Sequence, residues 1–154
     1  MKKLRTLLAA ALLALTVVAA PTASAAQKNL VAFGDSILAD PGADIYLSSR
    51  LTSSTANGAN CPSSNNFAKR TGAKVGLPVR DYSCSGAVSM SQGPQISTQI
   101  DTAIRNGALT ADTQRVIFSS GFNDTYNNSN LSRDQLRARF VRTTAPQIER
   151  IKRA

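Results

Sequence analysis

The 154-residue sequence contains no histidine and only two cysteines, Cys61 and Cys84. A structural zinc site needs four ligands, which come mainly from these two residue types. We therefore expect no metal site. The absence of histidine also removes the side chain that most often acts as a general base near neutral pH.

Aromatic residues make up only 5% of the chain, and acidic residues (9) are half as numerous as basic ones (18). Basic residues cluster near the C-terminus, and such clusters can bind nucleic acid or anionic membranes. Here no aromatic residues are interleaved with the charges, and apolar residues recur at helical spacing. We therefore expect a solvated helix face and no nucleic-acid partner. The basic residues concerned are Arg133, Arg137, Arg139, Arg142, Arg150, Lys152 and Arg153.

Long apolar runs are absent after residue 25. Before it, basic residues 1–5 lead into the apolar stretch 6–20, and Ala23-Ser24-Ala25 resembles a signal-peptidase site. The apolar stretch is shorter than the ~20 residues of a membrane-spanning helix. We expect residues 1–25 to be a cleaved signal peptide, and residues 26–154 to be one secreted domain without a membrane span. Loss of Lys2, Lys3 and Arg5 would lower the net charge from +9 to +6.

In the oxidising environment that a secreted protein meets, two cysteines form a disulfide by default. A bond between Cys61 and Cys84 would close a loop of about two dozen residues. In the loop-entropy account, such a bond stabilises the fold by about 3 kcal/mol.

The short apolar run Leu30–Phe33 predicts a buried strand. Alternating apolar residues predict a second strand at Leu77–Ser83, and the apolar run Arg115–Ser119 predicts a third. Between the first two strands, residues 37–60 predict a loop with a short helix around Ile45, and residues 65–70 predict the end of a helix that Gly72 stops.

The later part of the chain carries clear helix signals. Ile96, Ile100 and Ile104 form an apolar stripe along residues 95–105, which Asn106-Gly107 ends. Ser132 and Gln135 form a capping box that opens a last helix, which Pro146 is expected to kink or restart. Strands and helices therefore alternate, which predicts parallel strands in a three-layer α/β/α domain. Three strands are few for such a sheet, so we expect the domain to be incomplete.

Each predicted strand ends in a polar, glycine-containing segment: Gly34-Asp35-Ser36, Ser85-Gly86 or Gly121-Phe122-Asn123-Asp124. A single segment of this composition is also typical of an ordinary turn. In a parallel sheet, however, the carboxyl ends of the strands gather at one edge, where ligands bind. Together the three segments supply what acyl transfer needs. Ser36 is the candidate nucleophile, and the N–H groups of Ser36 and Gly86 with the Asn123 amide could hold the oxyanion.

These three segments in this order resemble the motifs of the SGNH (GDSL-type) hydrolases. The stretch from Cys61-Pro62 to Cys84-Ser85-Gly86-Ala87 resembles that of the secreted actinobacterial esterases and lipases. The resemblance implies a flavodoxin-like α/β/α fold, a Cys61–Cys84 disulfide and hydrolysis of a small-molecule ester, lipid or acylated carbohydrate. It implies catalysis without a cofactor, by Ser36 with Gly86 and Asn123 at the oxyanion. Asp35 and Asp124 are expected to brace their loops.

The family's fourth motif, Asp-x-x-His, has no counterpart, because the sequence has no histidine. A serine hydroxyl is a weak nucleophile without a base. We expect that the sequence is truncated before this motif. Two alternatives remain open: an inactive fragment, and a secreted module that binds lipid or carbohydrate without turnover.

Overall fold

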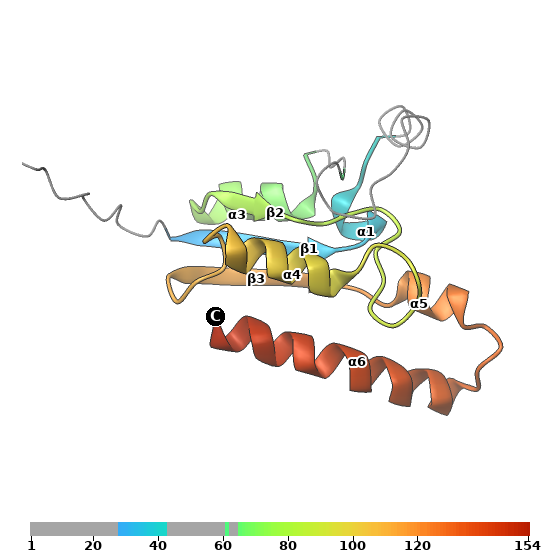
Figure 1. Ribbon diagram of the computed structural model, residues 1–154. Helices are drawn as coiled ribbons and strands as arrows, with labels where there is room; N and C mark the ends of the chain where they lie inside the picture. Colours follow the sequence, from blue (N-terminus) through green and yellow to red (C-terminus); the bar gives the residue numbers. More distant parts are fainter. Residues whose placement is uncertain (1–27, 43–60, 62–64) are drawn as a thin grey trace, which may run out of the picture.

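The structure is a computed structural model that describes residues 28–42, 61 and 65–154 (Figure 1). The predicted signal peptide and the predicted short helix around Ile45 lie outside the described residues. The described part contains a parallel sheet in the order β2-β1-β3. Its strands are β1 (Asn29–Gly34), β2 (Val79–Asp81) and β3 (Thr113–Ser119).

Strand β1 is the centre of the sheet and pairs with both neighbours. Leu30 aligns with Val79 of β2 and with Arg115 of β3. All six residues of β1 are buried, and four of them form the continuous apolar run that a strand covered on both faces requires. The predicted α/β class with three parallel strands is confirmed.

Helices cover both faces of this sheet, so the domain has three layers (Figure 1). Leu30 and Ala32 pack with Leu38 and Ala68 on one face, and Val31 and Phe33 pack beneath α4 on the other. Successive side chains of β1 point to opposite faces of the sheet, so they contribute to two separate cores. The described helices are α1 (Ser36–Ala39), α3 (Phe67–Val75), α4 (Ile96–Arg105), α5 (Phe122–Asn127) and α6 (Arg133–Arg153).

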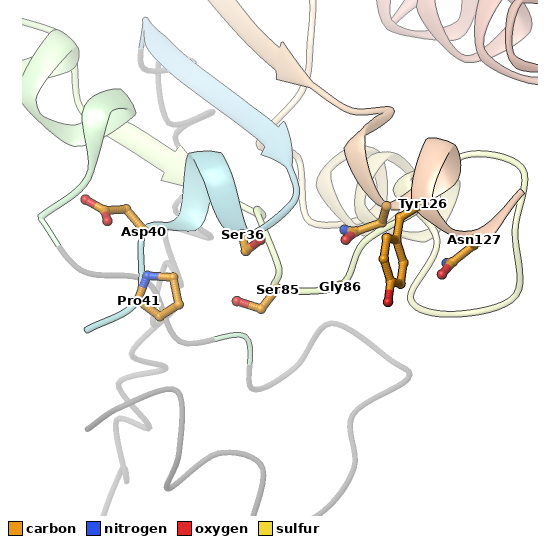
Figure 2. A pocket seen from close by; sticks show the side chains of 8 residues that line it. Ser36, Asp40, Pro41, Ser85, Gly86, Tyr126 and Asn127 are labelled. Carbon is orange, nitrogen blue, oxygen red and sulfur yellow. The ribbon is translucent and has the colours of Figure 1, made fainter. Parts of the chain in front are cut away.

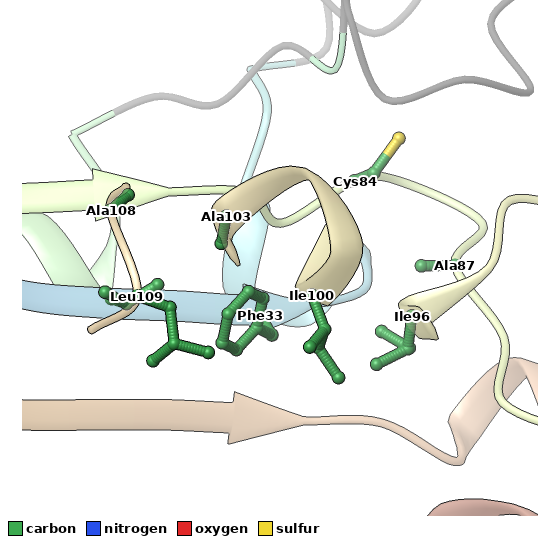
Figure 3. Close-up of a cluster of buried hydrophobic side chains, with 9 residues drawn as sticks. Phe33, Cys84, Ala87, Ile96, Ile100, Ala103, Ala108 and Leu109 are labelled. Carbon is green, nitrogen blue, oxygen red and sulfur yellow. The ribbon is translucent and has the colours of Figure 1, made fainter. Parts of the chain in front are cut away.

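The larger core lies between the sheet and α4 (Figure 3). Phe33 stands at its centre, and the end of α6 contributes Ile151. Of the predicted isoleucine stripe, Ile96 and Ile100 are fully buried, but Ile104 is 40% exposed and Ala103 takes its place. A spacing of four residues drifts by about 40° per step around a helix of 3.6 residues per turn, so the third member leaves the buried face.

The predicted helix end at Gly72 is wrong, and so is the predicted restart at Pro146. Helix α3 passes through Gly72 and ends at Gly76, whose φ of 69° is the left-handed conformation favoured at a C-cap. Helix α6 continues without a break through Pro146. The predicted capping box is confirmed: Ser132 and Gln135 hydrogen-bond each other's backbone N–H at the start of α6.

The predicted disulfide is also confirmed. It joins Cys61 to Cys84 with 4.8 Å between their Cα atoms and 23 residues of sequence separation. The Cys84 N–H donates to the Gly34 carbonyl over 2.8 Å, so the disulfide attaches beside the end of β1. It therefore anchors the segment that carries Ser85 and Gly86.

Gly72 sits inside α3 because the helix approaches β2 closely there. A Cβ atom at this position would lie 2.1 Å from Val79 Cγ2 and 2.7 Å from the Leu77 carbonyl oxygen. We predict that Gly72→Ala lowers the free energy of unfolding by about 1–3 kcal/mol, as overpacking does, despite alanine's better helix propensity. Urea denaturation followed by circular dichroism measures this.

Lys74→Ala, at an exposed position of the same helix, is the matched control and should change stability by less than about 0.5 kcal/mol. A Gly72→Ala protein as stable as the parent would show that α3 does not contact β2 this closely.

Candidate functional site

The candidate site lies where the order of the sheet changes direction. Strand β2, which follows β1 in the chain, lies on one side of β1, and β3 lies on the other side. The order β2-β1-β3 is the beginning of the flavodoxin-like arrangement, in which ligands bind beyond the carboxyl ends of β1 and β3. Ser36 follows β1 and Asn123 follows β3, so both lie at this point.

Ser36 is the first residue of α1, directly after the buried N-cap Asp35. One carboxylate oxygen of Asp35 accepts the Ile37 N–H over 3.0 Å, which fixes the turn that leads out of β1. The N–H of a first helical residue has no partner within its own helix. Ser36 therefore presents its hydroxyl and its backbone N–H at the same place, the corner between β1 and α1.

Gln99 of α4 holds the backbone just before this corner. Its side-chain amide accepts the Gly34 N–H and donates to the Gly34 carbonyl, each over 2.9 Å. Gly34 is buried, so these bonds help to satisfy backbone groups that would be costly to leave without a partner. Sequence reasoning missed Gln99. Its signal is a polar residue beside Ile100, within the apolar stripe of α4.

Gly86 lies in the loop after β2, with a φ of 81° that side chains rarely allow. A Cβ atom there would meet nothing within 4 Å, so the space beside Gly86 is open to a ligand. Within the described residues its N–H donates no hydrogen bond. It can therefore act as an oxyanion donor.

Asn123 belongs to α5, a short helix where the sequence predicted only a polar loop. Its Nδ2 donates to the Ala87 carbonyl over 3.0 Å. An asparagine amide carries two hydrogens. One therefore ties α5 to the Gly86 loop, and the other remains for a ligand.

Asp124 is fully buried and joins the same two segments. Its carboxylate accepts the N–H groups of Ser89, Met90 and Ser91 over 2.7, 2.9 and 3.0 Å. Asn128, one helical turn later, donates to the Asp124 carbonyl and to the Ser91 hydroxyl. These bonds hold the loop after β2 against α5.

The three candidate catalytic residues line one hollow of about 560 Å³ (Figure 2). Gly86 and Ser85 come from the loop after β2, between the corner that carries Ser36 and the α5 helix. Asp35, the N-cap of α1, and Asp124, within α5, are not among its described lining residues. That lining is Ser36, Asp40, Pro41, Ser85, Gly86, Asn123, Tyr126 and Asn127.

The chain matches no family model and is similar to no curated protein. Among the described residues, no helix is both long and apolar enough to cross a membrane. The described part also holds no group of three or more histidine, cysteine, aspartate or glutamate side chains that could bind a metal ion.

Burial raises the pKa of Asp35 above its ordinary value of 3.8, against the lowering effect of the N–H bond from Ile37; the nearby Asp124 carboxylate adds to the rise. The folded protein thus holds this proton more tightly than the unfolded chain does. Its free energy of unfolding therefore falls as the pH rises from the ordinary pKa through the raised one.

We predict that Asp35→Asn removes this pH-dependent loss. Asparagine caps a helix about as well as aspartate and does not titrate. The stability of the parent relative to the variant should fall as the pH rises from the ordinary pKa of 3.8 through the raised one, because Asp35 becomes ionised. Urea denaturation across this range measures it, with the exposed Asp112→Asn as control. A relative stability that rises with pH would contradict the prediction.

Asp124→Asn should lower the free energy of unfolding by about 2–3 kcal/mol. The substitution removes a charged acceptor and places an NH₂ group against at least one buried N–H. Hydrogen exchange should also speed up at residues 89–91. Asp112→Asn again serves as the control. Unchanged exchange at these three amides would show that the carboxylate does not hold the loop.

Proposed function

We propose that the chain is a secreted serine hydrolase of the SGNH type, which cleaves carboxylic esters with Ser36 as nucleophile. The observation that carries the proposal is that Ser36, Gly86 and Asn123 converge on one hollow at the carboxyl ends of the strands. The disulfide supports secretion, because such bonds persist in oxidising compartments.

In the proposed reaction, the Ser36 hydroxyl oxygen bonds to the ester carbonyl carbon while its proton passes to a general base. The carbonyl oxygen becomes an oxyanion held by the N–H groups of Ser36 and Gly86 and by the Asn123 amide. Collapse of this intermediate releases the alcohol, which takes up the proton. Water then cleaves the acyl-serine in the same way and yields the carboxylic acid.

These donors suit the oxyanion because they are neutral and already positioned. The Gly34–Gln99 bonds hold the Ser36 corner, and the Asn123–Ala87 bond sets the distance between α5 and the Gly86 loop. Fixed donors need no reorganisation as charge develops. The proton acceptor is the remaining requirement, and this sequence has no histidine to supply it.

The test therefore supplies the base from solution. We predict that imidazole stimulates hydrolysis of triacetin by the purified protein, and that Ser36→Ala abolishes the stimulation beyond that of imidazole alone. Asn123→Ala should reduce it about 100-fold or more, because it removes one oxyanion donor. Titration of released acetic acid measures the rate. Mass spectrometry should find an acetyl group on Ser36.

Asn130→Ala, at an exposed position outside the described lining, is the matched control for Asn123→Ala and should keep the parent rate. Equal imidazole-dependent rates in the parent and Ser36→Ala would refute the proposal. Cooperative unfolding with ligand binding but no hydrolysis would favour the non-catalytic binding module instead.

A further inference from the structure

Most of the described side chains that line the hollow are polar. Six of the eight described lining residues carry a hydroxyl, amide or carboxyl group, and Pro41 and Tyr126 are the two with ring side chains. None of the described lining residues is a leucine, isoleucine, valine, methionine or phenylalanine. A fatty acyl chain gains binding energy by burying methylene groups against an apolar wall. This lining gives a long chain little to bury against.

Tyr126 provides an apolar ring surface in this lining, and its position suits the stacking of a sugar ring. The side chain is 79% exposed yet lines the hollow, and Asn127 stands beside it on α5 (Figure 2). A pyranose has an apolar C–H face, which can stack on an aromatic ring, and a rim of hydroxyl groups. The amides of Asn123 and Asn127 can hydrogen-bond such a rim.

A second hollow of about 550 Å³ adjoins the first through Asn127, which lines both. Arg139 donates a hydrogen bond to Asn128 there, over 3.3 Å. The amide, hydroxyl and guanidinium groups of this lining match further sugar hydroxyls. Its described residues are Met90, Ser91, Gln92, Asn127, Asn128 and Arg139.

Ser85 adds unused hydrogen-bonding capacity next to the nucleophile. Its hydroxyl oxygen is buried and finds no partner in the described part of the chain, although the residue lines the first hollow. A buried hydroxyl without a partner is unfavourable, and a ligand that pairs with it relieves that cost.

We propose that the substrate is a short-chain acyl ester of a carbohydrate, whose sugar ring stacks on Tyr126 and whose next unit occupies the second hollow. This inference rests on the proposed ester hydrolysis at Ser36. It predicts that long-chain lipid esters are no better substrates than short-chain esters. Arg139 and Ser91 would then contact the neighbouring sugar and not the ester.

The test compares O-acetylated xylo-oligosaccharides with triacetin, tributyrin and tricaprylin, all with imidazole present. We expect kcat/KM to be at least tenfold higher for the acetylated oligosaccharides than for triacetin. Among the three glycerol esters, kcat/KM should stay level or fall as the acyl chain lengthens. An apolar acyl pocket would instead raise it about fourfold per buried methylene, and that result would overturn the proposal.

Tyr126→Ala should lower the ratio of oligosaccharide to triacetin activity about tenfold, through loss of the stacked ring. Tyr126→Phe should keep the ratio. Phe122→Ala is the matched control: Phe122 lies one turn earlier on α5, is 64% exposed and is not among the described lining residues. A ratio that Tyr126→Ala leaves unchanged would overturn the stacking role.

A binding experiment separates failure of this inference from failure of the hydrolase proposal. The Ser36→Ala protein is titrated with the same acetylated oligosaccharides, and the backbone amide signals of residues 85–92 and 123–128 are followed by NMR. Shifts in both segments support the carbohydrate site even if no hydrolysis occurs. Hydrolysis of triacetin that depends on Ser36, with no such shifts, would leave the hydrolase standing and refute the carbohydrate substrate.

Discussion

The candidate site depends on one buried carboxylate. Asp124 accepts three consecutive backbone N–H groups, from Ser89 to Ser91, and so draws the loop after β2 onto α5. The same interaction sets the approach of Asn123 to Ala87, next to Gly86. Charge-assisted bonds to backbone N–H groups are strong. Without this link, the Gly86 N–H after β2 and the Asn123 amide after β3 would be held less firmly relative to each other.

The Ser36 side of the hollow is held independently of Asp124. Strand β1 holds it. Strand β1 is buried on both faces and pairs on both edges, and Gln99 closes its last backbone groups. Ser36 therefore projects from the most constrained point of the sheet. Rigid support of this kind is what an oxyanion-binding site requires, because its donors must be in place before charge develops. The raised pKa of Asp35 reflects the burial that this rigidity entails.

Much of the fold follows from local patterns. The apolar run in β1, the capping box of α6 and the glycine-ended strands predict the elements because each signal is contained within a few residues. The errors have different causes. The sequence pattern predicts a helix end at Gly72, but the missing Cβ of this residue allows the close contact with Val79. Pro146 was expected to interrupt α6, which nevertheless continues through it. Ile104 fell outside the core because helical rotation, and not spacing alone, decides which face is buried.

The sequence by itself determined which chemical groups this protein has: a serine after a buried strand, a glycine able to adopt positive φ, an asparagine amide, a cysteine pair and no histidine. These follow from residue types and their local order. Only the tertiary structure decided that the groups share one hollow, that Gln99 and Asp124 hold its two sides, and that Tyr126 lines it. Such contacts join residues tens of positions apart. Their partners are selected by how parallel strands and their crossover helices pack, which no local pattern records.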